Sequence, residues 1–532
     1  MNFIKHILPF FLLALSLPLH SQFISSITYP DTTKQVYINP NDPSVKAANT
    51  ITAEELKVLL TELASDEYEG RETGFPGNAR AADFISDYYN KLGTKKVGEN
   101  NGHKQSVAFT WSSWKETNVI INRKKYRHLW DYLAFPTKNI SMPPLMTDEI
   151  VFVGYGIDDK NYNDYRKAKV KNKVILMYEG LPNQNKNWAD DSWTTEKKLQ
   201  VAKEKGAKMV LIIANDIKAM LAENRKILLG PTMTLGKVEE KNMATANHIF
   251  ISPSTAQDLW GEAEGKIIKA RDKGRTSGKP KAVKFKTFLS LVNNKKLNSI
   301  EGHNVLGFIE GSDKKEEIVV VSAHYDHIGK KGDDVYNGAD DNASGTSAVM
   351  EIAQAFVQAK KEGNGPRRSV LCLHVTGEEK GLLGSAYYAS NPVFPLENTV
   401  VNVNVDMIGR VDKNYTDNPN YIYVIGSDRL STTLHRINEQ MNDKYSQITL
   451  DYTFNSESDP NRNYYRSDHY NFAVKGIPAI FYFSGVHEDY HMSTDTADKI
   501  QFDKMEKIAR LIFHTTWELA NREDRITVNV KP

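Results

Sequence analysis

Histidine, aspartate and glutamate side chains follow a series of short apolar runs in this 532-residue chain. The runs cover residues 318–321, 370–375, 400–405 and 477–483, and the side chains that follow them are His324, Asp326, Glu378, Glu379, Asp406 and His491. Asp340 and Asp341 stand between the first run and the next helix-like segment. Imidazole and carboxylate groups are the ligands that zinc-type cations prefer in proteins. Two histidines with three or more carboxylates therefore indicate a site for a pair of divalent cations.

The spacing within these motifs suits metal chemistry. Residues two apart in an extended chain share a face, so Asp326 can accept a hydrogen bond from the ring N–H of His324. Metal-bound imidazoles commonly have such a carboxylate behind them. Glu378 and Glu379 are adjacent and point to different sides, so one can bind a cation while the other acts as general base. The two neighbouring aspartates present the same choice, and spacing alone decides neither.

Each of these motifs is common when it occurs alone. A single His-x-Asp is usually a surface match, a Glu-Glu pair is usually solvated, and an Asp after a strand often caps a helix. Their joint occurrence at successive strand ends is much more specific. The histidines that lie within predicted strands or helices are interpreted as structural, namely His374, His435 and His514. Those that lie near the cluster and could line it are His327, His469 and His487.

The elements that must position these groups alternate between strand and helix from residue 303 onward. A helix is predicted over residues 346–361, and a closing helix carries one apolar face made by Met505, Ile508, Ile512 and Leu519. This alternation predicts an α/β fold with a mostly parallel, twisted sheet and helices on both faces. Ligands of such sheets sit beyond the carboxyl ends of the strands, which is where the histidines and carboxylates are expected.

The chain before residue 303 does not show this regular alternation of strand and helix. Thr52–Glu55 has a capping-box pattern before one predicted helix, and a second helix is predicted to stop at Gly93. Further on, a self-contained β-rich unit is predicted from one helical segment, 196–205, and four apolar strands, 150–153, 174–177, 209–213 and 248–251. Residues 266–286 contain nine Lys and Arg and one acid, and we interpret them as a solvated connecting segment.

Composition excludes several classes of protein. Hydrophobic residues make up 40% of the chain and charged residues 25%, which is globular composition. The 68 basic and 66 acidic side chains leave a net charge of +2, so no nucleic-acid partner is expected. No long apolar run lies outside the N-terminus, which excludes an integral membrane span there. The single cysteine, Cys372, stands in an apolar run and is interpreted as a small buried hydrophobe. The oligomeric state is not readable.

The N-terminus is typical of a secretory signal. Lys5 and His6 precede an apolar stretch over residues 7–19, and a small residue, Ser21, follows it. We therefore expect residues 1–21 to be a signal peptide and the protein to be secreted or periplasmic. The alternative is an uncleaved anchor helix.

Six segments resemble the co-catalytic di-zinc exopeptidase family, which includes bacterial leucyl aminopeptidases and glutamate carboxypeptidase. They appear in family order over residues 318–500 and read SAHYDHIG, NGADDNASG, TGEEKGLLGS, VNVDMIG, YRSDH and DYHMSTDT. The segment VFVGYGI and the strands after it resemble an inserted protease-associated domain. The resemblance implies an N-terminal part of the peptidase domain over 45–135, the insertion over 136–290 and the catalytic zinc peptidase domain over 291–525.

The resemblance also implies a role for each site residue and two zinc ions per chain. His324 and Asp406 hold one zinc, Asp341 bridges both, and Glu379 with His491 completes the second. The roles implied outside the metal set are those of Glu378 as general base, Asp326 as support for His324, and Tyr464 as a group that steadies the oxyanion. The peptide bond between Asp341 and Asn342 is expected to be cis.

These roles predict hydrolysis of peptides or proteins by a water that two metal ions and Glu378 activate. Family frequency favours an aminopeptidase. A carboxypeptidase of the same family is the alternative, because Arg410 or Arg466 could recognise a terminal carboxylate. There are two further alternatives: a glutaminyl cyclase-like enzyme with one zinc, and a catalytically inactive, receptor-like binding protein. The complete set of five ligand residues disfavours both.

Overall fold

The computed structural model describes residues 27–31, 33, 36–182, 191–237 and 243–531. The expected signal peptide, residues 1–21, lies outside the described residues. The chain divides into two compact units, one formed by residues up to Lys104 together with those from Val305 onward, and the other by Gln105–Asn304. The second unit is thus inserted into the sequence of the first.

The first unit is built on a mixed sheet whose four central strands are parallel. In spatial order these are β18 (Ala479–Phe483), β15 (Thr399–Val405), β11 (Lys314–His324) and β14 (Arg368–Val375). Outside β14, residues Val305–Ile309 of β10 (Val283–Ile309) pair antiparallel. Outside β18 lie β16 (Tyr421–Ile425), β17 (Thr449–Asp451) and β1 (Ile27–Thr28), of which only the β16–β17 pair is parallel. The predicted parallel sheet is confirmed at its centre, and antiparallel strands flank it.

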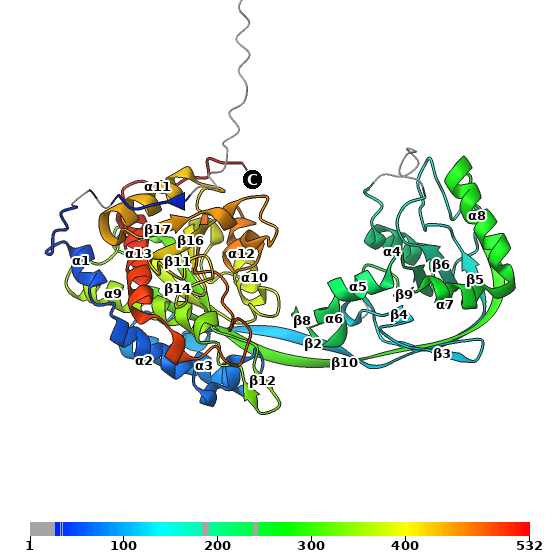
Figure 1. Cartoon of the computed structure of the whole chain (residues 1–532), viewed down its shortest axis with the longest axis horizontal. Helices are drawn as coiled ribbons and strands as arrows, with labels where there is room; N and C mark the ends of the chain where they lie inside the picture. Colours follow the sequence, from blue (N-terminus) through cyan, green and yellow to red (C-terminus); the bar gives the residue numbers. More distant parts are fainter. Residues whose placement is uncertain (1–26, 32, 34–35, 183–190, 238–242, 532) are drawn as a thin grey trace, which may run out of the picture. The chain divides into compact units, whose positions relative to one another are not determined.

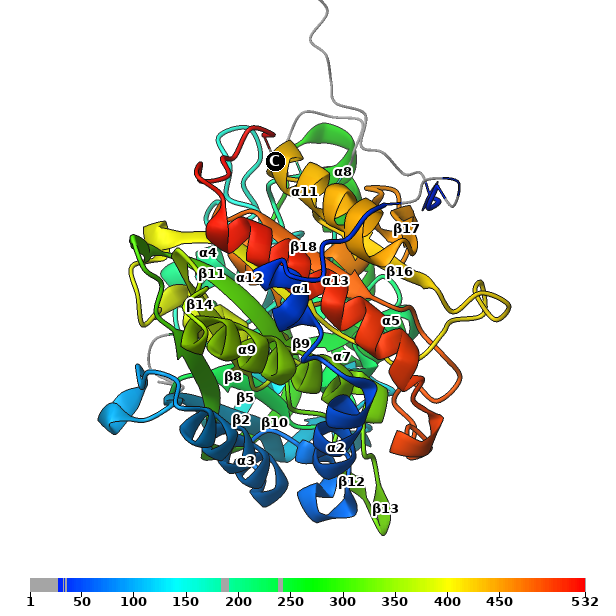
Figure 2. The same ribbon diagram turned by 90° about the vertical axis from the view of Figure 1, so that its left-hand side faces the viewer.

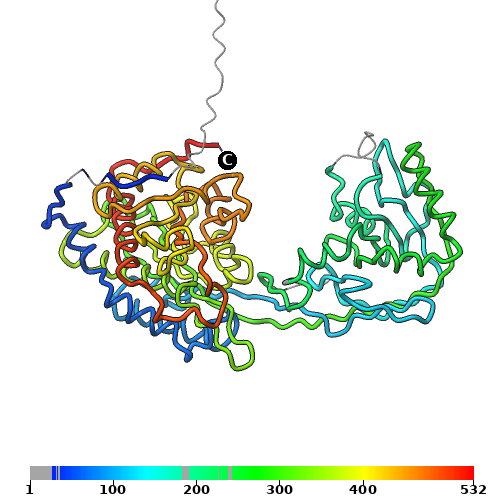
Figure 3. Tube along the Cα trace, viewed as in Figure 1, coloured from blue at the N-terminus to red at the C-terminus, as the bar shows by residue number. Residues whose placement is uncertain are grey.

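Helices cover both faces of this sheet, and Figure 2 shows the face that carries α9 and α13. One face carries α9 (Gly345–Lys361) and α13 (Phe502–Asn521), against which pack α1 (Pro43–Ala48), α2 (Ala53–Leu63), α3 (Pro76–Leu92) and α11 (Thr432–Met441). The other carries α10 (Leu383–Ser390) and α12 (His469–Ala473). The chain trace shows how the N-terminal helices, in blue, lie along α9 and α13 (Figure 3). The two chain segments of this unit therefore share one core.

Alternate residues of β11 enter two different cores, as expected of a strand covered on both faces. Val319 and Val321 are buried with the α9 and α13 side chains. Ile318 and Val320 are buried in a separate cluster with Leu371 and other residues of the α10–α12 face. Such strands are nearly continuous apolar runs, which is why the sequence marks them well. Cys372 is fully buried in the first of these cores, as expected.

The second unit has parallel strands of its own (Figure 1). Its parallel strands are β5 (Met142–Phe152), β6 (Val174–Tyr178), β7 (Met209–Ile213) and β9 (His248–Ile251), with β4 (Tyr132–Leu133) antiparallel at β9. The helices are α4 (Thr195–Glu204), α5 (Ile217–Glu223), α6 (Arg225–Leu229), α7 (Pro253–Trp260) and α8 (Glu264–Ser277). The unit is therefore more helical than the β-rich unit that we expected.

The ends of the second unit differ from the expected bounds of 136 and 290. The unit extends beyond these bounds because its first and last strands are long: β2 (Lys104–Ile121) opens it, and β10 pairs with β5 over Val283–Asn293.

The interpretation of residues 266–286 as a connecting segment was wrong. Its first part forms α8, and its last part begins β10, where lysines alternate with Phe285 and other buried residues. A two-residue alternation is typical of a half-buried strand.

Among the described residues, no helix is both long enough and apolar enough to cross a membrane.

Candidate metal centre

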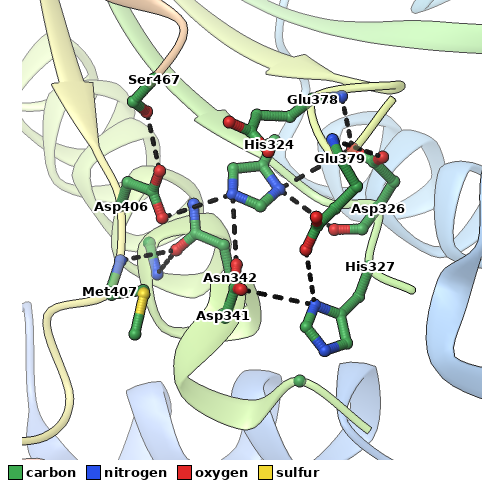
Figure 4. A network of polar contacts seen from close by, with 12 residues as sticks. His324, Asp326, His327, Asp341, Asn342, Glu378, Glu379, Asp406, Met407 and Ser467 are labelled. Carbon is green, nitrogen blue, oxygen red and sulfur yellow. Dashed lines mark hydrogen bonds and ion pairs between the residues drawn. The ribbon is translucent and has the colours of Figure 1, made fainter. Parts of the chain in front are cut away.

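The parallel strands of the first unit bring Glu378 and the five predicted metal ligands to one edge of the sheet, and Figure 4 labels all of these except His491. His324 is the last residue of β11, Asp406 directly follows β15, and Glu378 and Glu379 follow β14. Asp341 lies in the segment that leads into α9. His491 comes from the loop after β18. The peptide bond between Asp341 and Asn342 is cis, as expected.

The first group of side chains surrounds the Nε2 atom of His324. This nitrogen lies 3.3 Å from Asp406 Oδ1 and 3.4 Å from Asp341 Oδ1. The Nδ1 atom of the same ring contacts the main-chain oxygen of Asp326 at 3.0 Å, which leaves Nε2 to face the site. Ser467 Oγ donates to Asp406 Oδ2 at 2.7 Å and so turns Oδ1 toward His324. All of these side chains are buried.

The second group surrounds the other carboxylate oxygen of Asp341. His491 Nε2 lies 3.1 Å from Asp341 Oδ2 and 2.9 Å from Glu379 Oε1. His327 Nδ1 lies 3.2 Å from the same Glu379 oxygen and 3.6 Å from Asp341 Oδ2. Asp341 thus presents one oxygen to each group. This is the arrangement that a carboxylate bridging two cations requires.

The structure separates the members of each adjacent carboxylate pair. Asp340 turns away from the cluster, since Gly409 N donates to its Oδ1 at 2.6 Å and its Oδ2 lies 3.2 Å from His487 Nε2. Glu379 joins the His491 group, whereas Glu378 lies with His324 and Asp406. Contacts with Gly409 and His487 therefore hold Asp340, and Asp341 is the member of this pair that faces the cluster.

The pKa values of the two glutamates are shifted in opposite directions. Burial raises the pKa of Glu378 well above its ordinary value, and the charge of Glu379 adds to this against the opposing effect of His324. Burial acts on Glu379 in the same direction, but contacts with His327 and His491 hold the pKa of Glu379 well below its ordinary value. Neighbouring groups with pKa values pushed apart are typical of an acid/base residue beside a charged ligand.

The donor set fits divalent cations. Buried carboxylates are costly unless positive charge compensates them. The buried acids here are Asp326, Asp341, Glu379, Asp406 and Asp468, and Arg71 is the buried arginine whose charge acts on three of them. In addition, His491 Nε2 and both ring nitrogens of His327 are buried without a hydrogen-bond partner in the described part of the chain. Cations at this position would supply both the charge and the partners.

The carboxylate of Asp326 accepts hydrogen bonds from the main-chain N–H groups of Glu378 and Glu379. Its Oδ1 accepts from Glu378 N at 3.1 Å, and its Oδ2 accepts from Thr73 Oγ1 at 2.9 Å. Its carboxylate lies 3.7 Å from His324 Nδ1, farther than its own main-chain oxygen. Asp326 therefore supports His324 through its backbone more closely than through the carboxylate that we expected to do so.

Residues 304–516 match Peptidase family M28. Proteins named "Probable leucine aminopeptidase" from Trichophyton verrucosum (strain HKI 0517) and Arthroderma otae (strain ATCC MYA-4605 / CBS 113480) are similar to this chain. The first is 31% identical over 214 residues and the second 32% over 216, with 39% of this chain and 55% of each relative covered. The chain thus spans about half the length of the curated relatives that it matches. The family resemblance predicted from the motifs is confirmed for the M28 segment.

A solved structure supports the fold over nearly the whole chain. The aminopeptidase from Aneurinibacillus sp. strain AM-1 superimposes with a TM-score of 0.53, at 18% identity, and the match covers 92% of this chain and 98% of that chain. At this identity the likeness shows the fold alone, and it confirms the predicted α/β class.

Tyr490 lies beside the cluster. The centroid of its ring lies 3.9 Å from that of His491, on which it stacks, and burial, followed by the charges of Asp341 and Glu379, raises the pKa of its hydroxyl. Tyr464 instead lies under the guanidinium of Arg429, and burial raises its pKa to about 12, which the charge of Arg429 opposes. The oxyanion role of Tyr464 stays a prediction that this placement disfavours. The position of Tyr490 directly before a predicted ligand was a signal that we overlooked.

Arg71 is a further residue that sequence reasoning missed. It is fully buried, and its guanidinium donates to four main-chain oxygens at 2.6 to 2.8 Å, those of Leu63, Tyr325, Asn337 and Gly338. These contacts tie the N-terminal segment to the loops that carry His324 and Asp341. No spacing rule distinguishes such an arginine from one on the surface.

Proposed function

We propose that this protein is a zinc-dependent exopeptidase, an aminopeptidase that binds two zinc ions and acts on peptides or proteins. The observation that carries the proposal is Asp341, whose two oxygens face two separate histidine and carboxylate groups beside Glu378. His324 and Asp406 would hold one ion, Glu379 and His491 the other, and Asp341 both. Bound there, the ions would polarise the scissile carbonyl and lower the pKa of the attacking water.

The side chains around the ions would move and hold protons. Glu378 accepts the proton of the attacking water on its carboxylate and returns it to the leaving amine nitrogen. Its raised pKa suits a group that must carry this proton between the two steps. Tyr490 keeps its proton, because burial raises its pKa, and can donate a hydrogen bond to the carbonyl oxygen. Asp326 positions Glu378 through the main-chain N–H of that residue.

The arginines that could recognise a terminal carboxylate support the aminopeptidase over the carboxypeptidase. Arg410 is already engaged: its NH1 and NH2 groups each lie 3.0 Å from Asp489 Oδ2, and Glu488 is 3.3 Å away. Arg466 is exposed rather than buried at the cluster. The names of the relatives, leucine aminopeptidases, agree with this reading.

A panel of free, N-blocked and C-blocked peptides tests the proposal. The purified protein with added zinc should cleave peptides only when their N-terminus is free, and a chelator should abolish this activity. Cleavage that requires a free C-terminus would make the protein a carboxypeptidase. One bound zinc with cyclisation of N-terminal glutamine would favour the cyclase. Two bound ions without hydrolysis of any peptide would favour the binding protein.

Glu378→Gln tests the general base. The variant should keep both metal ions, measured by elemental analysis, and lose activity by about 10²–10⁴-fold, the range that general acid-base catalysis contributes. The matched control is Glu316→Gln, the same change at an exposed position of β11, which should remain fully active. A fully active, metal-loaded Glu378→Gln enzyme would contradict the assignment.

Two further proposals concern the rest of the chain. The second unit is an inserted protease-associated domain, which is supported by its place between the two segments of the first unit. Residues 1–21 are a signal peptide, so the mature protein is secreted or periplasmic. N-terminal sequencing of the protein recovered from cell fractions and medium tests this, since a retained residue 1 would exclude cleavage.

A further inference from the structure

His327 is a buried imidazole that the proposed mechanism does not use. It follows β11, and its side chain is 0% exposed. Its main-chain N–H donates to the main-chain oxygen of Arg71 at 3.3 Å, but neither ring nitrogen has a hydrogen-bond partner among the described residues. Burying a polar group without a partner costs free energy, and native proteins seldom leave one so.

The fold seats this ring closely. Gly338 lies against it, and a Cβ atom at that position would approach His327 Cγ to 2.5 Å. Gly338 also has a φ of +57°, which side-chain-bearing residues rarely adopt. The backbone beside His327 thus has no room for a side chain, and the ring is held against the cluster.

The Nδ1 atom of His327 faces the same two oxygens as the proposed zinc ligand His491. It lies 3.2 Å from Glu379 Oε1 and 3.6 Å from Asp341 Oδ2, and His491 Nε2 lies 2.9 and 3.1 Å from these oxygens. The four ligand atoms are all within 4.8 Å of one another. Each of these approaches is an ion-pair contact between an imidazole nitrogen and a carboxylate oxygen. Atoms that converge in this way have the arrangement of ligands around one cation.

We propose that His327 Nδ1 is a fourth protein ligand of the cation held by Asp341, Glu379 and His491. This inference rests on the proposed function and goes beyond its five-ligand set. With His327, two nitrogens and two oxygens of the protein would hold this ion, which could still bind the attacking water because zinc can expand to five ligands during a reaction. His324, Asp341 and Asp406 would hold the other cation, which would have one protein ligand fewer. The His327 side is therefore the tight position, and the His324 side is the exchangeable one.

Metal binding to the purified full-length protein tests this. Competition with a chelator should resolve a tight and a weak zinc equivalent in the wild type. His327→Phe keeps a ring but removes the donor, and it should weaken the tight equivalent by at least about 10–100-fold, the loss that even an outer-shell partner causes. The first equivalent of Co²⁺ should give the intense visible bands of a four-coordinate ion in the wild type, and these bands should change in the variant.

The controls separate a ligand from a packing residue. His374→Phe makes the same change at another buried histidine, whose ring contacts Tyr89 outside the cluster, and it should leave both equivalents and the cobalt bands unchanged. His327→Ala serves if the phenylalanine variant does not fold. X-ray absorption of the doubly loaded protein should report three imidazoles over two zinc ions in the wild type and two in either His327 variant.

The two proposals fail differently. A wild type that binds two ions, together with His327 variants whose affinities and cobalt bands match it, would overturn the His327 assignment and leave the proposed function standing. A wild type that binds no divalent metal would overturn both.

Discussion

Acidic residues follow parallel strands in both units of this protein, yet among the described residues only the first unit gathers a candidate metal centre. In the second unit, Glu179 follows β6 and Asp216 lies three residues beyond β7. Glu179 accepts from the main-chain N–H of Asn215 at 2.7 Å, and Asp216 caps α5 by accepting from Lys218 N and Ala219 N. Each of these carboxylates is partly or fully exposed and is used by nearby backbone.

In the first unit the corresponding carboxylates are buried and face imidazoles. Asp341 and Glu379 each approach two histidine nitrogens or more, and the groups of possible ligands found among the described residues both lie here. The difference teaches that an acid after a strand indicates a site only when local N–H groups do not already use its charge. Burial together with convergence on imidazoles distinguishes the two cases.

The largest expected effect comes from removing the shared carboxylate. Asp341→Ala should lose both bound ions and, with them, essentially all hydrolysis, because one oxygen serves each group. Zinc should raise the thermal midpoint of the wild type, since a ligand that binds only the folded state stabilises it, and should not raise that of the variant. Elemental analysis and thermal unfolding with and without zinc measure these outcomes.

The metal-free variant provides the internal control for that experiment. Removing one of several buried like charges relieves repulsion, so metal-free Asp341→Ala should unfold no lower than the metal-free wild type. A variant that keeps two ions and a normal zinc response would contradict the bridging role.

A smaller effect is expected at the tyrosines. Tyr490→Phe should reduce turnover by about 10²–10³-fold, the loss measured when one oxyanion donor is removed, without changing metal content. Tyr464→Phe makes the same change at the ring beside Arg429 and should leave turnover nearly unchanged. Steady-state kinetics on one peptide substrate measure both. The opposite ranking would return the role to Tyr464.

The sequence predicted the parts of this molecule that follow from continuous apolar runs. Strands β14, β15 and β18 are buried on both faces and are rich in apolar residues, so their ends, which the predicted ligands follow, were found. Strand β10 was misread because its alternating lysines resemble a solvated segment. The five predicted ligands lie together in the structure, and their roles as ligands stay predictions.

Other parts of the site depend on contacts between residues far apart in the sequence, which spacing cannot express. Arg71 reaches the cluster through main-chain oxygens more than 250 positions away. The placement of Asp340 away from the cluster is set by Gly409 and His487. The orientation of His327 depends on Gly338, which bears no chemistry of its own.

The smallest effect is expected in the second unit and tests the other side of the comparison. Asp216→Ala removes the N-cap of α5 and should cost about 1 kcal/mol of the stability of that unit, the usual loss for an N-cap aspartate. Zinc content and peptide hydrolysis should not change, because this carboxylate neutralises backbone N–H groups and not a cation. Thermal unfolding and elemental analysis measure the two quantities on one sample. Loss of a bound ion in this variant would mean that an exposed acid that caps a helix can also be a ligand, and the distinction between the two units would fail.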